Sequence, residues 1–254
     1  MSREMRYFSL ALTLMLPVAA FAQSVPGTDR QFDVYVIHDV MVPMRDGVKL
    51  ATDVYLPAVQ GQPLPGPWPT VVERTPYGKG AFLANTPTGA DYAKRGYALV
   101  VQDVRGRYNS EGVFLSYSQE GPDGLDTMQW IHDQPWCNRR IGVTGSSYFA
   151  STAQAILVQN APGLAAGIIR VGPGNYHEDG AWNGGTFLLA HNVNYALSLA
   201  LVGKEAAADA AVGSAIAAAS RPPAAFHLMI QSPLAPGAAP FGLAPSYDAW
   251  YQAS

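Results

Sequence analysis

The sequence predicts an α/β fold in which a mainly parallel sheet has helices on both faces. Between residues 70 and 171, short apolar runs alternate with amphipathic segments, which is the rhythm of parallel strands joined by helical crossovers. The chain has 254 residues and is 48% hydrophobic, so it can bury one sizeable core. A hairpin signal ahead of this region adds an antiparallel edge to the predicted sheet.

The predicted hairpin joins strands at residues 32–42 and 49–56 through the turn residues Asp46 and Gly47. Further strands are predicted at residues 70–74, 97–104, 140–144 and 164–171, and helices at residues 90–95, 123–133 and 148–159. The strands at 97–104 and 164–171 are mostly apolar, so we expect both to be buried.

After Gly174 the pattern changes to a helical excursion without further sheet. Helices are predicted at residues 188–202 and 204–220, and the second ends at Arg221-Pro222-Pro223. Residues 231–254 are rich in Pro, Ala and Gly. Two interpretations fit this segment, a cap over an active site and a packing appendage, and composition alone does not choose between them.

The N-terminus has the pattern of a secretory signal peptide. Arg3 and Arg6 precede a largely apolar run at residues 7–18, and Ala20-Phe21-Ala22 is a small-x-small cleavage site. We expect cleavage after Ala22, a periplasmic or secreted mature protein, and no stable membrane span after cleavage. The alternative is an uncleaved anchor, but the run is shorter than the ~20 apolar residues that a spanning helix needs.

Composition argues against several functions. Charged residues make up only 14% of the chain, the net charge is −3 and no basic run occurs. The sequence therefore lacks the cluster of basic residues that is typical of nucleic-acid binding. Cys137 is the single cysteine, so no internal disulfide can form. With one cysteine and no clustered histidines, we expect no zinc, no other metal and no cofactor. The oligomeric state stays open.

The strongest candidate for chemistry is Ser147, which lies between the predicted strand at 140–144 and the helix that starts at Tyr148. A serine on such a turn is the layout of a nucleophile elbow, which exposes the hydroxyl and aims the following N–H at the place where an oxyanion forms. Gly145 leaves room for the turn. Serine is also a common helix N-cap, and the local motif fits both roles equally. Ser146 is a weaker candidate because Gly145 then falls one residue too close.

Other polar residues have two interpretations each. Tyr77 follows the strand at 70–74, where a phenol could serve as an oxyanion donor, but a loop tyrosine also fits an amphipathic surface. Asp103 and Arg105 are expected to organise their loop by charge-assisted hydrogen bonds, and Asp103 precedes the nucleophile strand, which is the wrong order for a triad acid. None of the histidines follows a late strand, where a general base belongs; they are His38, His132, His177, His191 and His227.

Five motifs occur in order along the chain. They are Asp46-Gly47-Val48-Lys49-Leu50-Ala51-Thr52-Asp53-Val54-Tyr55, Arg74-Thr75-Pro76-Tyr77, Asp103-Val104-Arg105-Gly106, Gln134-Pro135-Trp136-Cys137-Asn138 and Gly145-Ser146-Ser147-Tyr148. Together they resemble the CocE/NonD hydrolases, which are related to the X-Pro dipeptidyl-peptidase (S15) group and include the α-amino-acid ester hydrolases. The resemblance strengthens the interpretation of Ser147 as a nucleophile.

The resemblance implies an α/β-hydrolase domain at residues 30–175, incomplete here, and part of a helical cap at residues 176–254. It implies Ser147 as the nucleophile, with the Tyr77 hydroxyl and the Tyr148 backbone N–H as the oxyanion hole. The family's C-terminal strands, its jelly-roll domain and its triad Asp and His follow the cap, so we expect none of them in this chain.

The resemblance also implies a substrate pocket in the cap. Asp179 resembles an acidic position with which the amino-acid ester hydrolases hold the substrate's amine, although Glu178 and Asp179 also fit a solvated acidic pair. Trp182 and Phe187 are expected to face the acyl pocket. Ala150 departs from the family, which commonly has glycine there, and this is a small change.

The expected function is that of a serine hydrolase that cleaves ester or amide acyl bonds through an acyl-serine intermediate. Its substrates would be small-molecule esters, amides or short peptides. One alternative is X-Pro dipeptidyl-peptidase activity. The other is an inactive fragment, because a serine hydroxyl without a base has little nucleophilicity.

Overall fold

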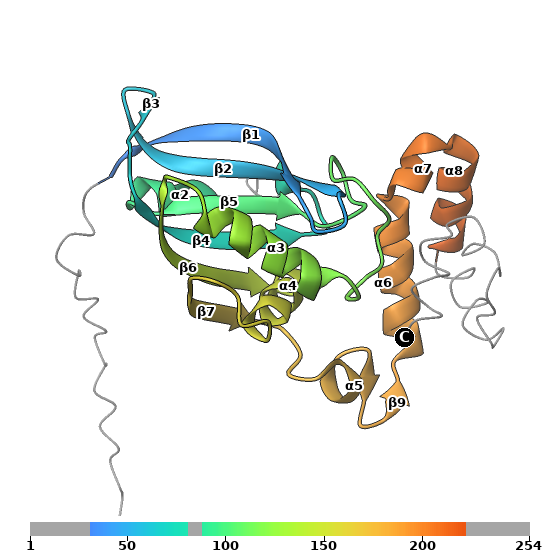
Figure 1. The fold of residues 1–254 in the computed structure, drawn as a ribbon. Helices are drawn as coiled ribbons and strands as arrows, with labels where there is room; N and C mark the ends of the chain where they lie inside the picture. Colours follow the sequence, from blue (N-terminus) through green and yellow to red (C-terminus); the bar gives the residue numbers. More distant parts are fainter. Residues whose placement is uncertain (1–30, 81–87, 222–254) are drawn as a thin grey trace, which may run out of the picture.

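The computed structural model describes residues 31–80 and 88–221. Figure 1 shows a twisted sheet with helices packed against it and a further group of helices beyond one end of its strands. The predicted signal peptide and residues 222–254 of the predicted cap lie outside the described residues. Within the described ranges, no helix is both long and apolar enough to cross a membrane.

The main sheet has seven strands in the order β1-β2-β5-β4-β6-β7, with β3 paired to β2. The strands are β1 (Asp33–Pro43), β2 (Lys49–Val59), β3 (Gln62–Pro63), β4 (Trp68–Thr75), β5 (Ala98–Asp103), β6 (Cys137–Ser146) and β7 (Leu164–Arg170). The hairpin β1–β2 and the pair β2–β5 are antiparallel, whereas β5–β4, β4–β6 and β6–β7 are parallel. The predicted parallel sheet with an antiparallel edge is therefore confirmed.

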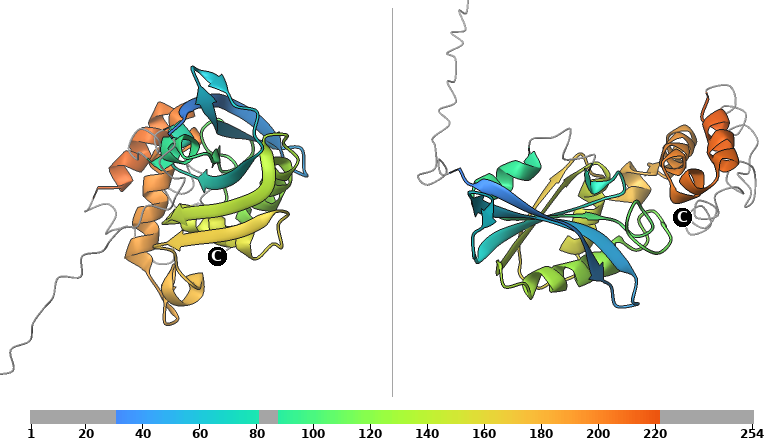
Figure 2. Two further views of the ribbon diagram at one scale, coloured as in Figure 1. Left: turned by 90° about the vertical axis from the view of Figure 1, so that its left-hand side faces the viewer. Right: turned by 90° about the horizontal axis from the view of Figure 1, so that it is seen from above.

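Helices cover both faces of this sheet, as the sequence predicts. They are α2 (Thr88–Lys94), α3 (Glu120–His132) and α4 (Tyr148–Leu157). Successive side chains of a strand point to opposite faces. Leu99 of β5 accordingly packs in a cluster with Ala93 of α2, whereas the next residue, Val100, packs with Met128 of α3. The view from above in Figure 2 shows α2 and α3 on opposite sides of the sheet.

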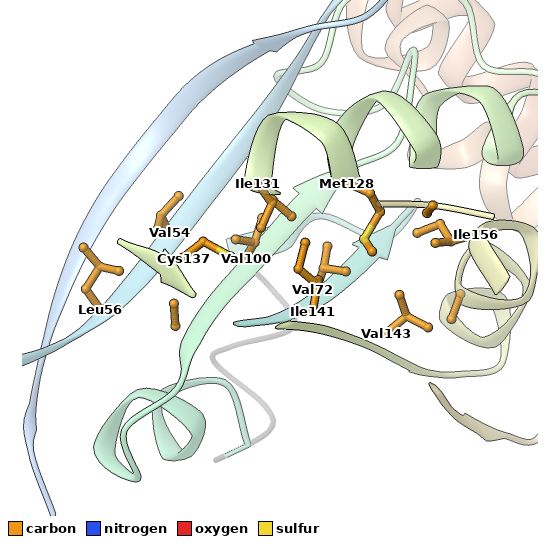
Figure 3. Close-up of a cluster of buried hydrophobic side chains, with 13 residues drawn as sticks. Val54, Leu56, Val72, Val100, Met128, Ile131, Cys137, Ile141, Val143 and Ile156 are labelled. Carbon is orange, nitrogen blue, oxygen red and sulfur yellow. The ribbon is translucent and has the colours of Figure 1, made fainter. Parts of the chain in front are cut away.

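The larger core lies between the sheet and the helices α3 and α4 (Figure 3). Met128 and Ile131 of α3 and Ile156 of α4 are at most 1% exposed and pack over strand residues such as Val72 and Ile141. Removing this apolar surface from water is the main favourable contribution to folding. It also fixes β4, β6 and α4 relative to one another.

The prediction that the strand at 164–171 is buried is wrong. Most residues of β7 are exposed, and the side chain of Ile168 is 57% exposed. The reason is position: in the part of the chain that the structure describes, β7 pairs with β6 alone and forms the edge of the sheet. Ile169 does pack against the larger core, so only one face of β7 is covered.

The segment after β7 contains more than the predicted helices. Its elements are α5 (Tyr176–Asp179), β8 (Trp182–Asn183), β9 (Thr186–Phe187), α6 (Leu189–Leu201), α7 (Lys204–Ala208) and α8 (Ala210–Ala219). The hairpin β8–β9 was not expected; Gly184 and Gly185 form its turn with positive φ angles, which glycine adopts at little cost. The single helix predicted at 204–220 is interrupted at Asp209, whose side chain accepts the N–H groups of Ala211 and Val212 and starts α8.

Helix α6 packs over the carboxyl ends of the parallel strands (Figure 1). Val193 and Leu197 of α6 share a buried cluster with Val104, which directly follows β5, and with Tyr148 at the start of α4. Two hydrogen bonds tie the segment down: Arg107 donates to the carbonyl of Leu199, and Lys204 donates to that of Ser110. The helical segment therefore lies at the carboxyl ends of the parallel strands, where the nucleophile motif also lies.

One buried acid destabilises the fold at neutral pH. Glu73 of β4 is only 5% exposed, and burial raises its pKa to about 7, although the charge of Arg170 lowers it. Since the unfolded chain loses this proton near pH 4.5, the folded state binds more protons between pH 4.5 and 7. The contribution of Glu73 to stability therefore falls as the pH rises through that window.

We predict that Glu73→Gln leaves the free energy of unfolding nearly unchanged at pH 4 and raises it by about 1–3 kcal/mol at pH 8. Urea unfolding of both proteins across this pH range measures the difference. A difference that does not change with pH would contradict this account of Glu73.

Candidate active site

Ser147 stands at a strained turn between β6 and α4. Its backbone has φ 60° and ψ −127°, a region that costs a non-glycine residue of order 1–3 kcal/mol. Ser147 occupies the N-cap position of α4, but its side chain makes no capping hydrogen bond. The residue is exposed, while the following Tyr148, Phe149 and Ala150 are buried. The capping interpretation therefore does not account for this exposed serine.

Gly145 makes the turn possible, as predicted. A Cβ atom built on Gly145 would lie 2.1 Å from the carbonyl oxygen of Phe149 and 2.6 Å from the amide nitrogen of Ala150. Both are backbone atoms of α4 and cannot move aside as a flexible side chain would. Any side chain at residue 145 would therefore push the helix away from the strand. Ser146, the weaker candidate, is still part of β6 and is less exposed than Ser147.

Tyr77 lies beside the residues that follow Ser147. It comes directly after β4, which runs parallel to β6, so the two strands end at the same edge of the sheet. The Tyr77 ring packs edge-on against Tyr148, with centroids 6.3 Å apart, and tilted against Phe149 at 5.8 Å. Its hydroxyl forms a 2.7 Å hydrogen bond with the hydroxyl of Tyr195 on α6. The structure thus brings Tyr77 against Tyr148, the residue that follows Ser147.

Tyr148 is held by a buried acid, Glu120, that sequence reasoning did not single out. Its hydroxyl donates to Oε1 of Glu120 at 2.7 Å and accepts the N–H of Tyr117 at 2.9 Å. Burial, and then the charge of Glu120, raise the pKa of Tyr148 well above its ordinary value, so the phenol stays protonated. Arg74 binds Glu120 in turn through Nη1 at 3.2 Å. The side chain of Tyr148 is therefore held, and with it the backbone N–H that follows Ser147.

The first N–H groups of a helix have no intrahelical acceptor. In α4, the N–H of Ala150 already bonds to the carbonyl of Ser147 at 2.9 Å, so the N–H of Tyr148 precedes the first intrahelical bond. Such groups carry the positive end of the helix dipole and suit a developing negative charge. The start of α4 can therefore provide one oxyanion donor beside the exposed serine.

The loop that carries Tyr77 is anchored by charged residues. The N–H of Lys79 donates to Oδ1 of Asp103 at 2.7 Å, and its ammonium lies 2.8 Å from both Asp39 and Asp53. Burial raises the pKa of Asp103 to about 6. The carboxylate of Asp103 thus anchors the Tyr77 loop, whereas it was expected to organise the loop after β5 together with Arg105.

Arg105 turns instead to other carboxylates. It forms 2.6 Å hydrogen bonds with Asp123 of α3 and with Asp46 of the hairpin turn. Hydrogen bonding to Asp123 is the main cause of the raised pKa of Arg105. The motif at 103–106 therefore connects the Tyr77 loop, through Asp103, with helix α3 and the β1–β2 turn, through Arg105.

The described histidines have other partners. His38 bonds to Asp53 at 3.0 Å, His132 to Asp133 at 3.3 Å, and the ring of His191 stacks on Tyr195. The structure defines nothing for the side chain of His177, and His227 lies outside the described residues. None of these hydrogen bonds involves Ser147. Among the described residues, no group of three or more His, Cys, Asp or Glu could hold a metal ion.

The proposed pocket residues lie together in the α5–β8–β9 segment. Asp179 is exposed, and its carboxylate accepts the N–H groups of Gly174 and Asn175. The rings of Trp182 and Phe187 pack on each other with centroids 5.0 Å apart. The segment is joined to the site by Tyr176, whose hydroxyl bonds to Ser151 on α4. These contacts fix the segment, and they leave the pocket role of the three residues a prediction.

We predict that Gly145→Ala destabilises the protein strongly, by about 3 kcal/mol or more, because the new methyl group meets backbone atoms of α4. Gly142 on the same strand is the matched control, since a Cβ there would have 3.8 Å to its nearest neighbour. Thermal unfolding of both variants tests this. Equal losses in the two variants would show that the close approach at residue 145 is not the cause.

Comparisons with known proteins place this geometry in a family. Residues 46–240 match the model of the X-Pro dipeptidyl-peptidase (S15) family. The cocaine esterase of Rhodococcus sp. (strain MB1 Bresler) is 39% identical over 134 residues, which are 52% of this chain and 22% of the esterase. The chain thus aligns with about a fifth of this relative's length.

Two solved structures are similar over more of the chain. An α-amino acid ester hydrolase superposes with a TM-score of 0.51 and 26% identity, over 72% of this chain and 32% of its own. An aminopeptidase from the marine sediment archaeon Thaumarchaeota archaeon superposes with a TM-score of 0.56 and 25% identity, over 88% of this chain and 41% of its own. The family model covers more than half of the chain, and the motifs sit where an α/β-hydrolase fold places them; the chain belongs to the X-Pro dipeptidyl-peptidase (S15) family, among its CocE/NonD-type hydrolases.

Proposed function

We propose that the protein is a serine hydrolase that cleaves ester or amide acyl bonds through an acyl-Ser147 intermediate. Its family supports a hydrolase of the esterase or peptidase type. The observation that carries the serine mechanism is the exposed Ser147 at a positive φ, without a capping bond and followed by Tyr148, on which Tyr77 packs. Backbone strain of this kind persists where the surrounding structure imposes it, and it is concentrated at functional sites.

In the proposed reaction, Ser147 Oγ attacks the carbonyl carbon while a general base takes its proton. The carbonyl oxygen becomes an oxyanion that accepts hydrogen bonds from the Tyr77 hydroxyl and the Tyr148 N–H. The tetrahedral intermediate then expels the alcohol or amine, which takes up a proton as it leaves. The acyl group remains bound to Ser147 as an ester. Water attacks this ester in the same way, releasing the acid and restoring Ser147.

The base and its orienting acid are assigned to a histidine and an aspartate that the described residues do not provide. His38 and His132 bond to Asp53 and Asp133, and His191 stacks on Tyr195, so none of the three is bonded to Ser147, whose hydroxyl needs a base to attack. The order Ser, Asp, His of this fold places both residues later in the protein than Ser147. If they are lacking, the isolated chain is the inactive fragment considered above.

Ester substrates are the first choice and X-Pro peptides the second. The curated relative is an esterase, and one similar structure is an α-amino acid ester hydrolase, whereas the family model is named for X-Pro dipeptidyl-peptidases. We propose Asp179, Trp182 and Phe187 as pocket residues in either case. A periplasmic or secreted location, after cleavage behind Ala22, is part of the same proposal.

Fluorophosphonate labelling of the protein as its gene encodes it tests the nucleophile. Ser147→Ala is expected to abolish labelling and to lower kcat for an ester by on the order of 10⁴–10⁶, since removing a nucleophile costs about this much in a serine protease. Ser146→Ala is the matched control and is expected to keep both. Undiminished labelling of Ser147→Ala would show that the assignment is wrong.

A further inference from the structure

The hydroxyl of Tyr77 bonds to a second phenol, which the helical segment supplies. Tyr77 follows β4 and Tyr195 lies on α6, and their hydroxyl groups form a 2.7 Å hydrogen bond. The two residues are 118 positions apart in the chain, so this bond exists only in the assembled fold.

Tyr195, Tyr117 and Tyr176 are partly buried and stay protonated. Burial raises the pKa of Tyr117 to about 12, and it raises the pKa values of Tyr176 and Tyr195 above their ordinary range. The ring of Tyr117 lies between those of Tyr148 and Tyr176, with centroids 4.5 Å from each. The ring of His191 stacks on Tyr195. Each phenol therefore has one hydrogen to donate and a ring that is held in place.

The count of hydrogens limits what Tyr77 can do. A phenol donates one hydrogen bond and can accept others. If Tyr77 donates to Tyr195, its hydrogen is used and it cannot donate to an oxyanion. If Tyr195 donates to Tyr77, the hydrogen of Tyr77 is free for the oxyanion, and the bond it receives strengthens the bond it gives.

We propose that Tyr195 is a positioning residue for catalysis: it donates its hydrogen to Tyr77 and so directs the Tyr77 hydroxyl toward the oxyanion. This inference rests on the proposed function of Tyr77. A charged acceptor forms the stronger hydrogen bond, so the oxyanion favours the arrangement in which Tyr195 donates to Tyr77 and Tyr77 donates to the oxyanion. The helical segment after β7 thereby takes part in the chemistry without touching the reacting atoms.

The test compares Tyr195→Phe, Tyr77→Phe and the double variant in the protein as its gene encodes it, with para-nitrophenyl acetate as the substrate. Each single variant loses one hydroxyl and keeps its ring. Tyr195→Phe is expected to lower kcat about tenfold, the worth of one hydrogen bond, with little change in KM or in the unfolding temperature. Tyr97→Phe is the control: this tyrosine is 42% exposed, packs on Tyr92 of α2 and is expected to keep full activity.

The double variant decides the mechanism. If Tyr195 acts through Tyr77, its removal costs nothing further once the Tyr77 hydroxyl is gone, so the two effects do not add. Additive losses would overturn the inference and indicate that Tyr195 contacts the substrate itself. Full activity of Tyr195→Phe alongside an impaired Tyr77→Phe would also overturn it, leaving the proposed function intact. Full activity of Tyr77→Phe would instead refute the oxyanion role on which the inference depends.

Discussion

The rest of this site depends on the hydrogen bonds of the buried residue Arg74. Arg74 is 1% exposed, and its Nε donates to Gln102 of β5 while its Nη1 donates to the side chain and the carbonyl of Glu120 on α3. The backbone carbonyl of Arg74 accepts a hydrogen bond from the hydroxyl of Thr152 on α4. It therefore joins two strands and two helices below the nucleophile turn. It also compensates the buried charge of Glu120, which would cost several kcal/mol if left unpaired. Tyr148 binds the same Glu120, so the hydrogen bonds of Arg74 also help to hold Tyr148, whose backbone N–H is the proposed oxyanion donor.

Two constraints of different kinds then meet at Ser147. One is steric: without a side chain at Gly145, β6 can turn directly into α4 and hold Ser147 at a positive φ. The other is polar: the Tyr77 hydroxyl bonds to Tyr195 of α6. The first comes from the sheet domain and the second from the helical segment. We propose that this segment is a cap that contributes to the site.

The local elements could be predicted from the sequence because their signals are local. The Asp46-Gly47 turn, the alternation of strands and helices, and the Gly145-x-Ser147 turn each depend on residues close together in the chain. The exposure of β7 could not be predicted, since its apolar composition is also that of a buried strand and its position at the edge is a matter of topology. The partners Glu120 and Tyr195 were missed for a similar reason: both contacts join residues far apart in sequence.

The most direct test of this account is a crystal structure of the protein, as its gene encodes it, with a boronic acid that mimics the tetrahedral intermediate. We predict a covalent bond from boron to Ser147 Oγ. One boronate oxygen should lie within about 2.7–3.1 Å of both the Tyr77 hydroxyl and the Tyr148 amide nitrogen. A boronate bound to another residue, or one whose oxygens both point away from Tyr77 and Tyr148, would contradict the account.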